Sequence, residues 1–245
     1  MKNLFKKLLN KKETMKNEDK RKPQETQNQI GASKKKTYYH LVLDRSGSMN
    51  SCWQEATQVI NRQIKDLTRI QAENPDTAII FSLCAFNQVL RFSEELMNVE
   101  TAKIDWTTIF PDGMTALFDA IGKSIEFVKE KAEEGLNEND SDVVMLVLTD
   151  GHENASKTHS GMNVKEMIQA CERSEKWNFL FLGAGLDVSE VTRDLDRGNK
   201  NSMSFEKAKL ASAMGMVSEE LNEFVKSKNT GNKKRNFFDD GDLSF

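Results

Sequence analysis

The sequence predicts an α/β protein built on a Rossmann-like, doubly wound and mostly parallel sheet of six strands, with one antiparallel edge strand and helices on both faces. Three observations support this fold class. Short apolar runs of strand length alternate with longer segments whose apolar residues recur at the helical period. Several of these runs lack a polar face, which is typical of parallel strands buried on both sides. Strands that alternate with helices favour a parallel sheet between two helical layers.

The expected strands begin where the composition changes from polar to apolar, near residue 38. The run at 38–43 ends in Asp44, and the run at 143–148 is likewise followed by an aspartate. Asn87-Gln88 turns the second strand back into a short antiparallel edge strand. The six expected strands occupy residues 38–43, 78–86, 89–92, 143–148, 179–182 and 202–205.

The expected helices lie between these runs. Three of them show apolar stripes at a period near 3.6 residues. The stripes are Val59, Ile60, Ile64, Leu67 and Ile70; Ala116, Leu117, Ala120, Ile121, Ile125 and Val128; and Leu210, Met214, Val217, Leu221 and Phe224. A further helix is expected over residues 162–173.

The 245 residues suit one α/β domain with polar ends. We expect a basic, mostly disordered arm over residues 1–36, a folded domain over 37–226 and a flexible acidic tail over 227–245. The arm holds twelve Lys and Arg against four acidic residues, a net charge of +8, which leaves −11 for the rest of a chain whose total is −3. A basic arm on an acidic body is more informative than the near-neutral total.

The first dozen residues have an amphipathic pattern. Their apolar residues occupy one helical face and five lysines occupy the other: Met1, Leu4, Phe5, Leu8 and Leu9 against Lys2, Lys6, Lys7, Lys11 and Lys12. Such a helix could contact an anionic membrane surface or dock in the groove of a partner. The alternative is a solvated tail, because a helix this short is marginal in water.

The cysteines and the hydropathy indicate a cytoplasmic protein. Cys52, Cys84 and Cys171 are widely spaced, form no CxxC pair and support neither a zinc knuckle nor a disulfide framework. Cys84 lies in an apolar run and is expected to be a small core residue. No stretch approaches the roughly 20 apolar residues of a membrane span. The basic amino-terminal segment lacks the apolar centre of a secretory signal.

Two aspartates are expected in one crevice. Asp44 follows the first strand, and Asp150 follows the run at 143–148. In a doubly wound sheet, ligands bind beyond the carboxyl ends of the strands where the strand order reverses, which in the order 3-2-1-4-5-6 lies between strands one and four. With the antiparallel edge strand counted as the third, 143–148 is the fourth strand. Two carboxylates this close repel unless a cation or a proton lies between them.

The residues beside these aspartates supply hydroxyl oxygens. Ser46 and Ser48 follow Asp44 on a tight turn, and Thr115 comes from a glycine-containing loop at a helix start. Two carboxylates and three hydroxyls, without His or Cys, favour Mg²⁺ or Mn²⁺ over zinc. Because only one or two anionic groups reach the ion, it would stay electrophilic and bind another anionic oxygen at an open position.

At these residues the chain resembles the metal-ion-dependent adhesion site of von Willebrand factor A-type domains. The matching segments, in the family's order, are Asp44-x-Ser46-x-Ser48, Gly113-Met114-Thr115-Ala116-Leu117 and Leu148-Thr149-Asp150-Gly151. The phrase that runs from Thr149 to Asn154 is similar to that of many prokaryotic members. The resemblance therefore implies a member of prokaryotic or phage type.

The resemblance also implies a role for each residue. Serines like Ser46 and Ser48 bind the metal directly, while residues like Thr115, Asp44 and Asp150 bind it directly or through water. A glutamate or aspartate of a protein partner then completes the octahedron. Bacterial members often work beside a ring ATPase, a kinase or a chelatase, so a ring ATPase or a signalling enzyme is the implied partner class. The last helix moves in some members; the sequence leaves this open here.

Each part of the motif has an ordinary structural alternative. Asp and Ser after a strand often cap the next helix, and Thr115 alone could do the same. Asp150-Gly151 alone is a common turn. The three parts together, in the right order, favour a metal site.

An enzyme is the main alternative to a binding module, since Mg²⁺ and serines could serve a metal-assisted phosphohydrolase. The sequence contains no P-loop, no GxSxG elbow and no DxD after the first strand. His152 and His159 are the candidate bases near Asp150, and His40 is expected inside a strand. We therefore expect coordination chemistry, not turnover.

The end of the chain suggests another alternative. Residues 237–245 resemble the acidic tip of bacterial single-stranded-DNA-binding proteins, from which Gly241 and Ser244 depart. Such a tail could make the chain a DNA-maintenance or defence adaptor with Phe245 as anchor, or could fold back onto the metal or the basic arm. An ordinary solubilising tail is the simpler interpretation. Direct nucleic-acid binding has little support, because the basic residues cluster without interleaved aromatics.

Overall fold

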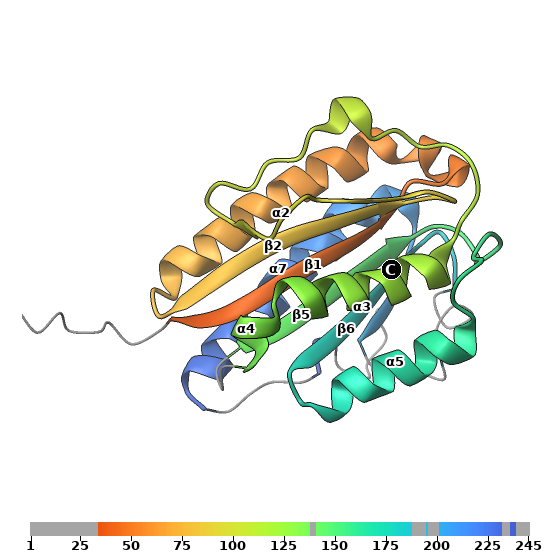
Figure 1. Ribbon diagram of the computed structural model, residues 1–245. Helices are drawn as coiled ribbons and strands as arrows, with labels where there is room; N and C mark the ends of the chain where they lie inside the picture. The colour runs from red at the N-terminus through yellow and green to blue at the C-terminus, as the bar shows by residue number, and fades with distance from the viewer. Residues whose placement is uncertain (1–33, 138–140, 188–194, 196–200, 232–235, 239–245) are drawn as a thin grey trace, which may run out of the picture. The chain divides into compact units, whose positions relative to one another are not determined.

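A mostly parallel sheet forms the centre of the domain, with its strands in the order β3-β2-β1-β5-β6-β7 (Figure 1). The computed structural model describes residues 34–137, 141–187, 195, 201–231 and 236–238. The strands are β1 (Lys35–Asp44), β2 (Thr77–Phe86), β3 (Leu90–Phe92), β4 (Met97–Asn98), β5 (Ser141–Thr149), β6 (Trp177–Ala184) and β7 (Ser202–Phe205). β3 and β4 both pair with β2 in the antiparallel sense, and the other pairings are parallel.

The predicted fold class is confirmed. The antiparallel edge beside β2 is the expected one, and the strand order reverses between β1 and β5 as expected. The two-residue strand β4 was not predicted, because a segment this short carries no hydrophobic period.

Helices cover both faces of the sheet (Figure 1). They are α2 (Trp53–Glu73), α3 (Leu117–Lys131), α4 (Glu133–Asn137), α5 (Gly161–Arg173) and α7 (Leu210–Asn229), with short 3-10 helices η1 (Gly47–Ser51), η2 (Trp106–Thr108) and η3 (Lys207–Lys209). α2 and α7 pack on one face, and α3 and α5 pack on the other. None of the helices in the described residues is long and apolar enough to cross a bilayer.

The alternation of side chains along β1 explains the two cores. Tyr39, Leu41 and Leu43 face the layer of α2 and α7, while Tyr38 and Val42 face the layer of α3 and α5. Successive side chains of a strand point to opposite faces, so a strand between two helical layers must be apolar throughout. The apolar runs of the sequence therefore become the central strands.

Two buried groups bear out expectations from the sequence. His40 is fully buried in β1, and burial lowers its pKa to about 3. Cys84 is fully buried in β2, and burial raises the pKa of its thiol to about 12. All three cysteines are buried free thiols.

The structure differs from the predicted acidic tail of residues 227–245. α7 extends to Asn229, and two residues of the predicted tail are buried: Phe237 is 1% exposed and Phe238 is 4% exposed. The ring of Phe237 packs against Phe224 of α7, with 5.2 Å between the ring centroids. These two residues therefore belong to the hydrophobic core. The amphipathic pattern of residues 1–12 and the acidic residues 239–245 lie outside the described residues.

Candidate metal centre

The carboxyl edge of the sheet brings the two aspartate-bearing strand ends together. β1 and β5 are parallel neighbours in which Leu43 lies opposite Leu148. Asp44 ends β1, and Asp150 follows the last residue of β5, Thr149. The hydroxyl of Thr149 donates a 2.6 Å hydrogen bond to Oδ2 of Asp44. The predicted meeting of the two strand ends at the switch point is present.

The turn after Asp44 brings two hydroxyls to the same place. The backbone N–H of Ser46 donates to Oδ1 of Asp44 at 2.7 Å. The hydroxyl oxygens of Ser46 and Ser48 lie 3.0 Å apart, and Ser48 Oγ donates to Oδ1 of Asp150 at 2.6 Å. The serines thus form a hydrogen-bonded bridge between the two aspartates.

Thr115 reaches the cluster from the loop before α3. The N–H of Gly47 donates a 3.0 Å hydrogen bond to the carbonyl of Gly113, which holds this loop beside the serine turn. Gly113 has a φ of +71°, a conformation that glycine adopts without strain. On the other side, Asn154 accepts from the N–H of Thr115 at 2.9 Å and donates its own N–H to the Thr115 carbonyl at 3.0 Å.

The space beside Gly151 shows how closely the oxygens converge. A Cβ on Gly151 would lie 3.0 Å from Thr115 Oγ1, 3.5 Å from Ser48 Oγ and 3.8 Å from Asp44 Oδ2. Oxygens from separate segments of the chain therefore surround one small cradle. Through the hydrogen bonds of Ser48, this cradle also includes Ser46 and Asp150, so all five predicted site residues lie together.

Burial makes the Asp44 carboxylate of this cluster costly to ionise. The side chains of Asp44 and Asp150 are both inaccessible to solvent. Burial raises the pKa of Asp44 to about 6, hydrogen bonds from Thr149 and Ser46 lower it, and the charge of Asp150 raises it. A bound cation would offset this cost, because it stabilises both ionised carboxylates.

The donor set fits a small, hard divalent cation. Its members are carboxylate and hydroxyl oxygens, the ligands that Mg²⁺ and Mn²⁺ prefer. Over the described residues there is no group of three or more His, Cys, Asp or Glu that could hold a metal. The cation would thus depend on the serine and threonine hydroxyls as well as on the two aspartates.

Residues that the sequence analysis did not assign hold the loop after Asp150 against α3. The carboxylate of Glu153 accepts hydrogen bonds from the backbone N–H groups of Phe118, Ala155 and Ser156. The carboxylate of Asp119 accepts from those of Lys157, Thr158 and His159. Both carboxylates thus accept backbone N–H groups at the contact between the loop and α3, and they hold Asn154 beside Thr115. In the sequence they look like ordinary surface charges.

A lysine was also missed. Lys207, in η3, places its ammonium against Oδ2 of Asp150. The two residues are 57 positions apart, and no sequence pattern pairs them.

Two of the three histidines make contacts with residues outside the cluster. His40 lies in the strand interior, where its Nδ1 is 2.7 Å from Ser82 Oγ. The ring of His159 packs over Gly122 of α3, 3.3 Å from Oε1 of Glu126. His152 is exposed.

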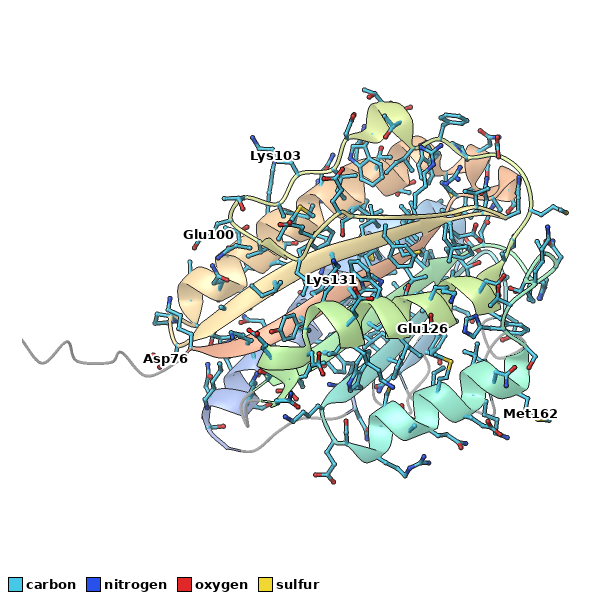
Figure 2. The ribbon with its side chains drawn as sticks, in the orientation of Figure 1. Asp76, Glu100, Lys103, Glu126, Lys131 and Met162 are labelled. Atoms are coloured by element: carbon cyan, nitrogen blue, oxygen red, sulfur yellow. The ribbon has the colours of Figure 1, made fainter. Side chains whose placement is uncertain are left out.

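An open groove lies apart from this cluster, at the antiparallel edge of the sheet. Residues of β3 and of the segment from 93 to 109 line it, and none of the five site residues does so. One of its lining residues, Lys103, lies on the loop that follows β4 (Figure 2).

The fold and the cluster define an α/β domain with a hydroxyl-rich candidate cation site at the switch point of its sheet. The family model of the von Willebrand factor type A domain matches residues 40–223. The chain belongs to this family, and the predicted resemblance is confirmed. Its prokaryotic or phage type stays a prediction. No curated protein matches the chain.

Solved structures share the fold at low identity. Proximal thread matrix protein 1 from the mussel byssus is 19% identical, with a TM-score of 0.51 over 76% of this chain and 46% of that chain. Another structure of that protein, described with a zinc-occupied MIDAS motif, is 18% identical, with a TM-score of 0.53 over 78% and 46%. The vWF domain of the type V pili tip protein Mfa5 from Porphyromonas gingivalis is 9% identical, with a TM-score of 0.57 over 83% and 98%. This chain thus spans less than half of the mussel protein.

Proposed function

We propose that this chain is a metal-dependent protein-binding module that captures an aspartate or glutamate of a partner through a bound divalent cation. Asp44, Ser46, Ser48, Thr115 and Asp150 would hold the ion. Mg²⁺ or Mn²⁺ is the proposed metal because every donor is an oxygen. Zn²⁺ is the cation against which Mg²⁺ and Mn²⁺ should be compared, because the mussel protein is described with a zinc-occupied motif.

One observation carries the proposal. Three oxygens from two separate segments, those of Thr115 and of Ser48 and Asp44, lie within 4 Å of a single point beside Gly151. Hydroxyls that point into a shared cradle with two buried carboxylates gain most when a cation occupies it. When bound, the ion would act as a Lewis acid that accepts a further anionic oxygen.

The surface around the cluster supports a protein as the ligand. Val89, Phe110 and Met114 are 54%, 55% and 54% exposed. Arg45, next to Asp44, donates 3.2 Å hydrogen bonds to the carbonyls of both Phe110 and Val89 and so holds their loops together. Apolar side chains exposed on neighbouring loops favour an interaction site.

These three residues also stand out over the described part of the chain. There, the only other large hydrophobic side chain counted as exposed is that of Met162, which lies near the start of α5 (Figure 2). We therefore propose that the partner presents its acidic residue next to apolar side chains. Binding, not turnover, would be the activity of this site.

The proposal can be tested in two steps. Calorimetry with Mg²⁺, Mn²⁺ and Zn²⁺ measures metal binding to the wild type, to Asp44→Ala and to Thr115→Ala. Asp76→Ala is a matched control, because Asp76 lies at the opposite end of the sheet, just before β2 (Figure 2). We expect Mg²⁺ or Mn²⁺ binding in the wild type and the control, and its loss in the two site variants. A wild type that binds neither ion refutes the proposal.

The second step identifies the ligand chemistry. Peptides are selected from a random display library on the wild type with Mg²⁺ and are eluted with EDTA. We expect every binder to need one Asp or Glu, so that its change to Asn or Gln abolishes binding. Binders that survive EDTA, or that tolerate the amide change, contradict acid capture. Binding of the same peptides by Asp44→Ala as tightly as by the wild type also contradicts acid capture.

A further inference from the structure

The ammonium of Lys207 occupies a built position beside the metal cluster. Its Nζ contacts Oδ2 of Asp150, lies 3.0 Å from the carbonyl of Ser48 and lies 3.1 Å from Oγ of Ser51. An ammonium has three N–H donors, and each has an oxygen acceptor here. Two of these acceptors belong to residues of the proposed metal site.

The stem of Lys207 is also held in place. Gly185, just after β6, has a φ of +72°, and a Cβ there would lie 3.2 Å from Cγ of Lys207. The N–H of Gly185 donates a 2.6 Å hydrogen bond to Phe205, the last residue of β7. The aliphatic stem of Lys207 thus packs against the backbone at the ends of β6 and β7. Its side chain is 32% exposed, whereas that of Asp150 is fully buried.

Lys207 changes the charge balance of the cluster. Asp44 and Asp150 together carry two negative charges when ionised, and a divalent cation alone would neutralise them. With Lys207 in place, the two carboxylates and the ammonium have a net charge of −1. A divalent cation therefore gives the cluster a net charge of +1. One further carboxylate then restores neutrality. Unbalanced charge is costly in a site shielded from water, so the lysine disfavours the metal alone and favours metal with an acid.

We propose that Lys207 is a tethered cation that weakens metal binding in the free protein and strengthens binding of the partner's carboxylate once the metal is present. This inference rests on the proposed function and adds a determinant of specificity to it. Metal and partner would then bind cooperatively, since each relieves the charge that opposes the other. By linkage, the carboxylate raises the affinity for the metal by the same factor that the metal raises the affinity for the carboxylate.

If the ion pair of Lys207 and Asp150 had only a structural role, its loss would have a different effect. Loss of a structural pair would lower stability and leave metal affinity unchanged or weaker, because Asp150 would lose a partner that orients it. Loss of a tethered competitor strengthens metal binding instead. The sign of the change in metal affinity therefore separates the two roles.

The test measures Mn²⁺ affinity near neutral pH by electron paramagnetic resonance, with and without acetate as a simple carboxylate. Lys207→Met keeps the aliphatic stem against Gly185 and removes the charge, and Lys207→Gln is a second neutral variant. Lys207→Arg keeps the charge. Lys209→Gln removes a lysine charge two residues away in the same 3-10 helix and is the matched control.

We expect both neutral variants to bind Mn²⁺ alone about tenfold more tightly than the wild type, a size typical of coupling between sites. Acetate should raise the Mn²⁺ affinity of the wild type, the arginine variant and the control, and should have a smaller effect on the neutral variants. Melting curves of the metal-free proteins check folding, and either neutral variant suffices if the other does not fold.

Three outcomes overturn the inference. One is an equal or weaker Mn²⁺ affinity in a folded neutral variant. The second is an acetate effect in the neutral variants as large as in the wild type. The third is no acetate effect in the wild type. A wild type that binds neither Mn²⁺ nor Mg²⁺ refutes the proposed metal site itself, so the two failures are distinguishable.

Discussion

Ser48 Oγ donates a 2.6 Å hydrogen bond to Oδ1 of Asp150, although 102 residues separate the two in the sequence. The contact joins the turn after β1 to the turn after β5. Because these two parallel strands are neighbours in the sheet, their carboxyl ends meet at one edge. A hydroxyl from one turn and a carboxylate from the other thus face the same cradle.

A substitution at Gly151 tests this cradle without removing any of the five proposed metal ligands. We expect Gly151→Ala to weaken Mg²⁺ or Mn²⁺ binding by at least about tenfold, which corresponds to about 1.4 kcal/mol. The physical reason is that the new methyl group would lie 3.0 Å from Thr115 Oγ1 and would fill the space among the oxygens. Calorimetric titration measures the affinity.

The matched control for this variant is Gly215→Ala in α7, where an added Cβ meets nothing within 4 Å. Alanine in a helix stabilises it by up to about 1 kcal/mol relative to glycine, so the control should fold at least as well and bind metal as the wild type does. Unchanged metal affinity in Gly151→Ala would mean that the cradle does not hold the ion.

Asn154 is expected to position Thr115. Asn154→Ala removes the acceptor of the Thr115 N–H, and a buried unpaired N–H costs about 1–3 kcal/mol. We expect a lower melting temperature and a several-fold weaker affinity for Mn²⁺. Asn154→Asp restores an acceptor and should recover the melting temperature. A lower melting temperature with full metal affinity in Asn154→Ala would show that Thr115 is held by other contacts.

His40 should make the protein less stable in acid. The unfolded imidazole binds a proton as the pH falls below its ordinary pKa of 6.5, whereas burial keeps the native side chain neutral until about pH 3. Between these values the unfolded state therefore binds more protons, and the free energy of unfolding falls as the pH falls. The contribution of this residue is about 1.4 kcal/mol per pH unit.

His40→Gln isolates this effect, because glutamine does not titrate and offers polar atoms to Ser82. Urea unfolding from pH 7 to pH 4 should show a smaller loss of stability in the variant than in the wild type. If both proteins lose stability in parallel, the native histidine is protonated over the same range as the unfolded one.

Phe237 should contribute strongly to stability despite its place near the end of the chain. Phe237→Ala removes a ring that is 1% exposed and packs on Phe224, and such a change costs about 3–5 kcal/mol. Phe110→Ala, at a side chain 55% exposed, should change the free energy of unfolding by about 0.5 kcal/mol or less. Urea denaturation compares the two. Equal stabilities would place Phe237 outside the core.

The sequence alone was enough to predict the fold class and the convergence of the five candidate residues, because their signals are local. An apolar run such as residues 38–43 must be buried on both faces, and its period of two fixes which side chains meet each helical layer. Asp44-x-Ser46-x-Ser48 and Asp150-Gly151 each lie within a few residues of a strand end. The topology of a doubly wound sheet then predicts that these ends converge.

Only the tertiary structure decided the contacts between segments that share no local pattern. Lys207 reaches Asp150 because the ends of β6 and β7 place it there, and nothing near either residue in the sequence distinguishes it from other lysines. Phe237 lies in a polar segment, so composition assigned it to a tail, yet its ring finds apolar surface on α7. Hydrophobic burial and charge pairing depend on distance in space, which the sequence encodes only through the whole fold.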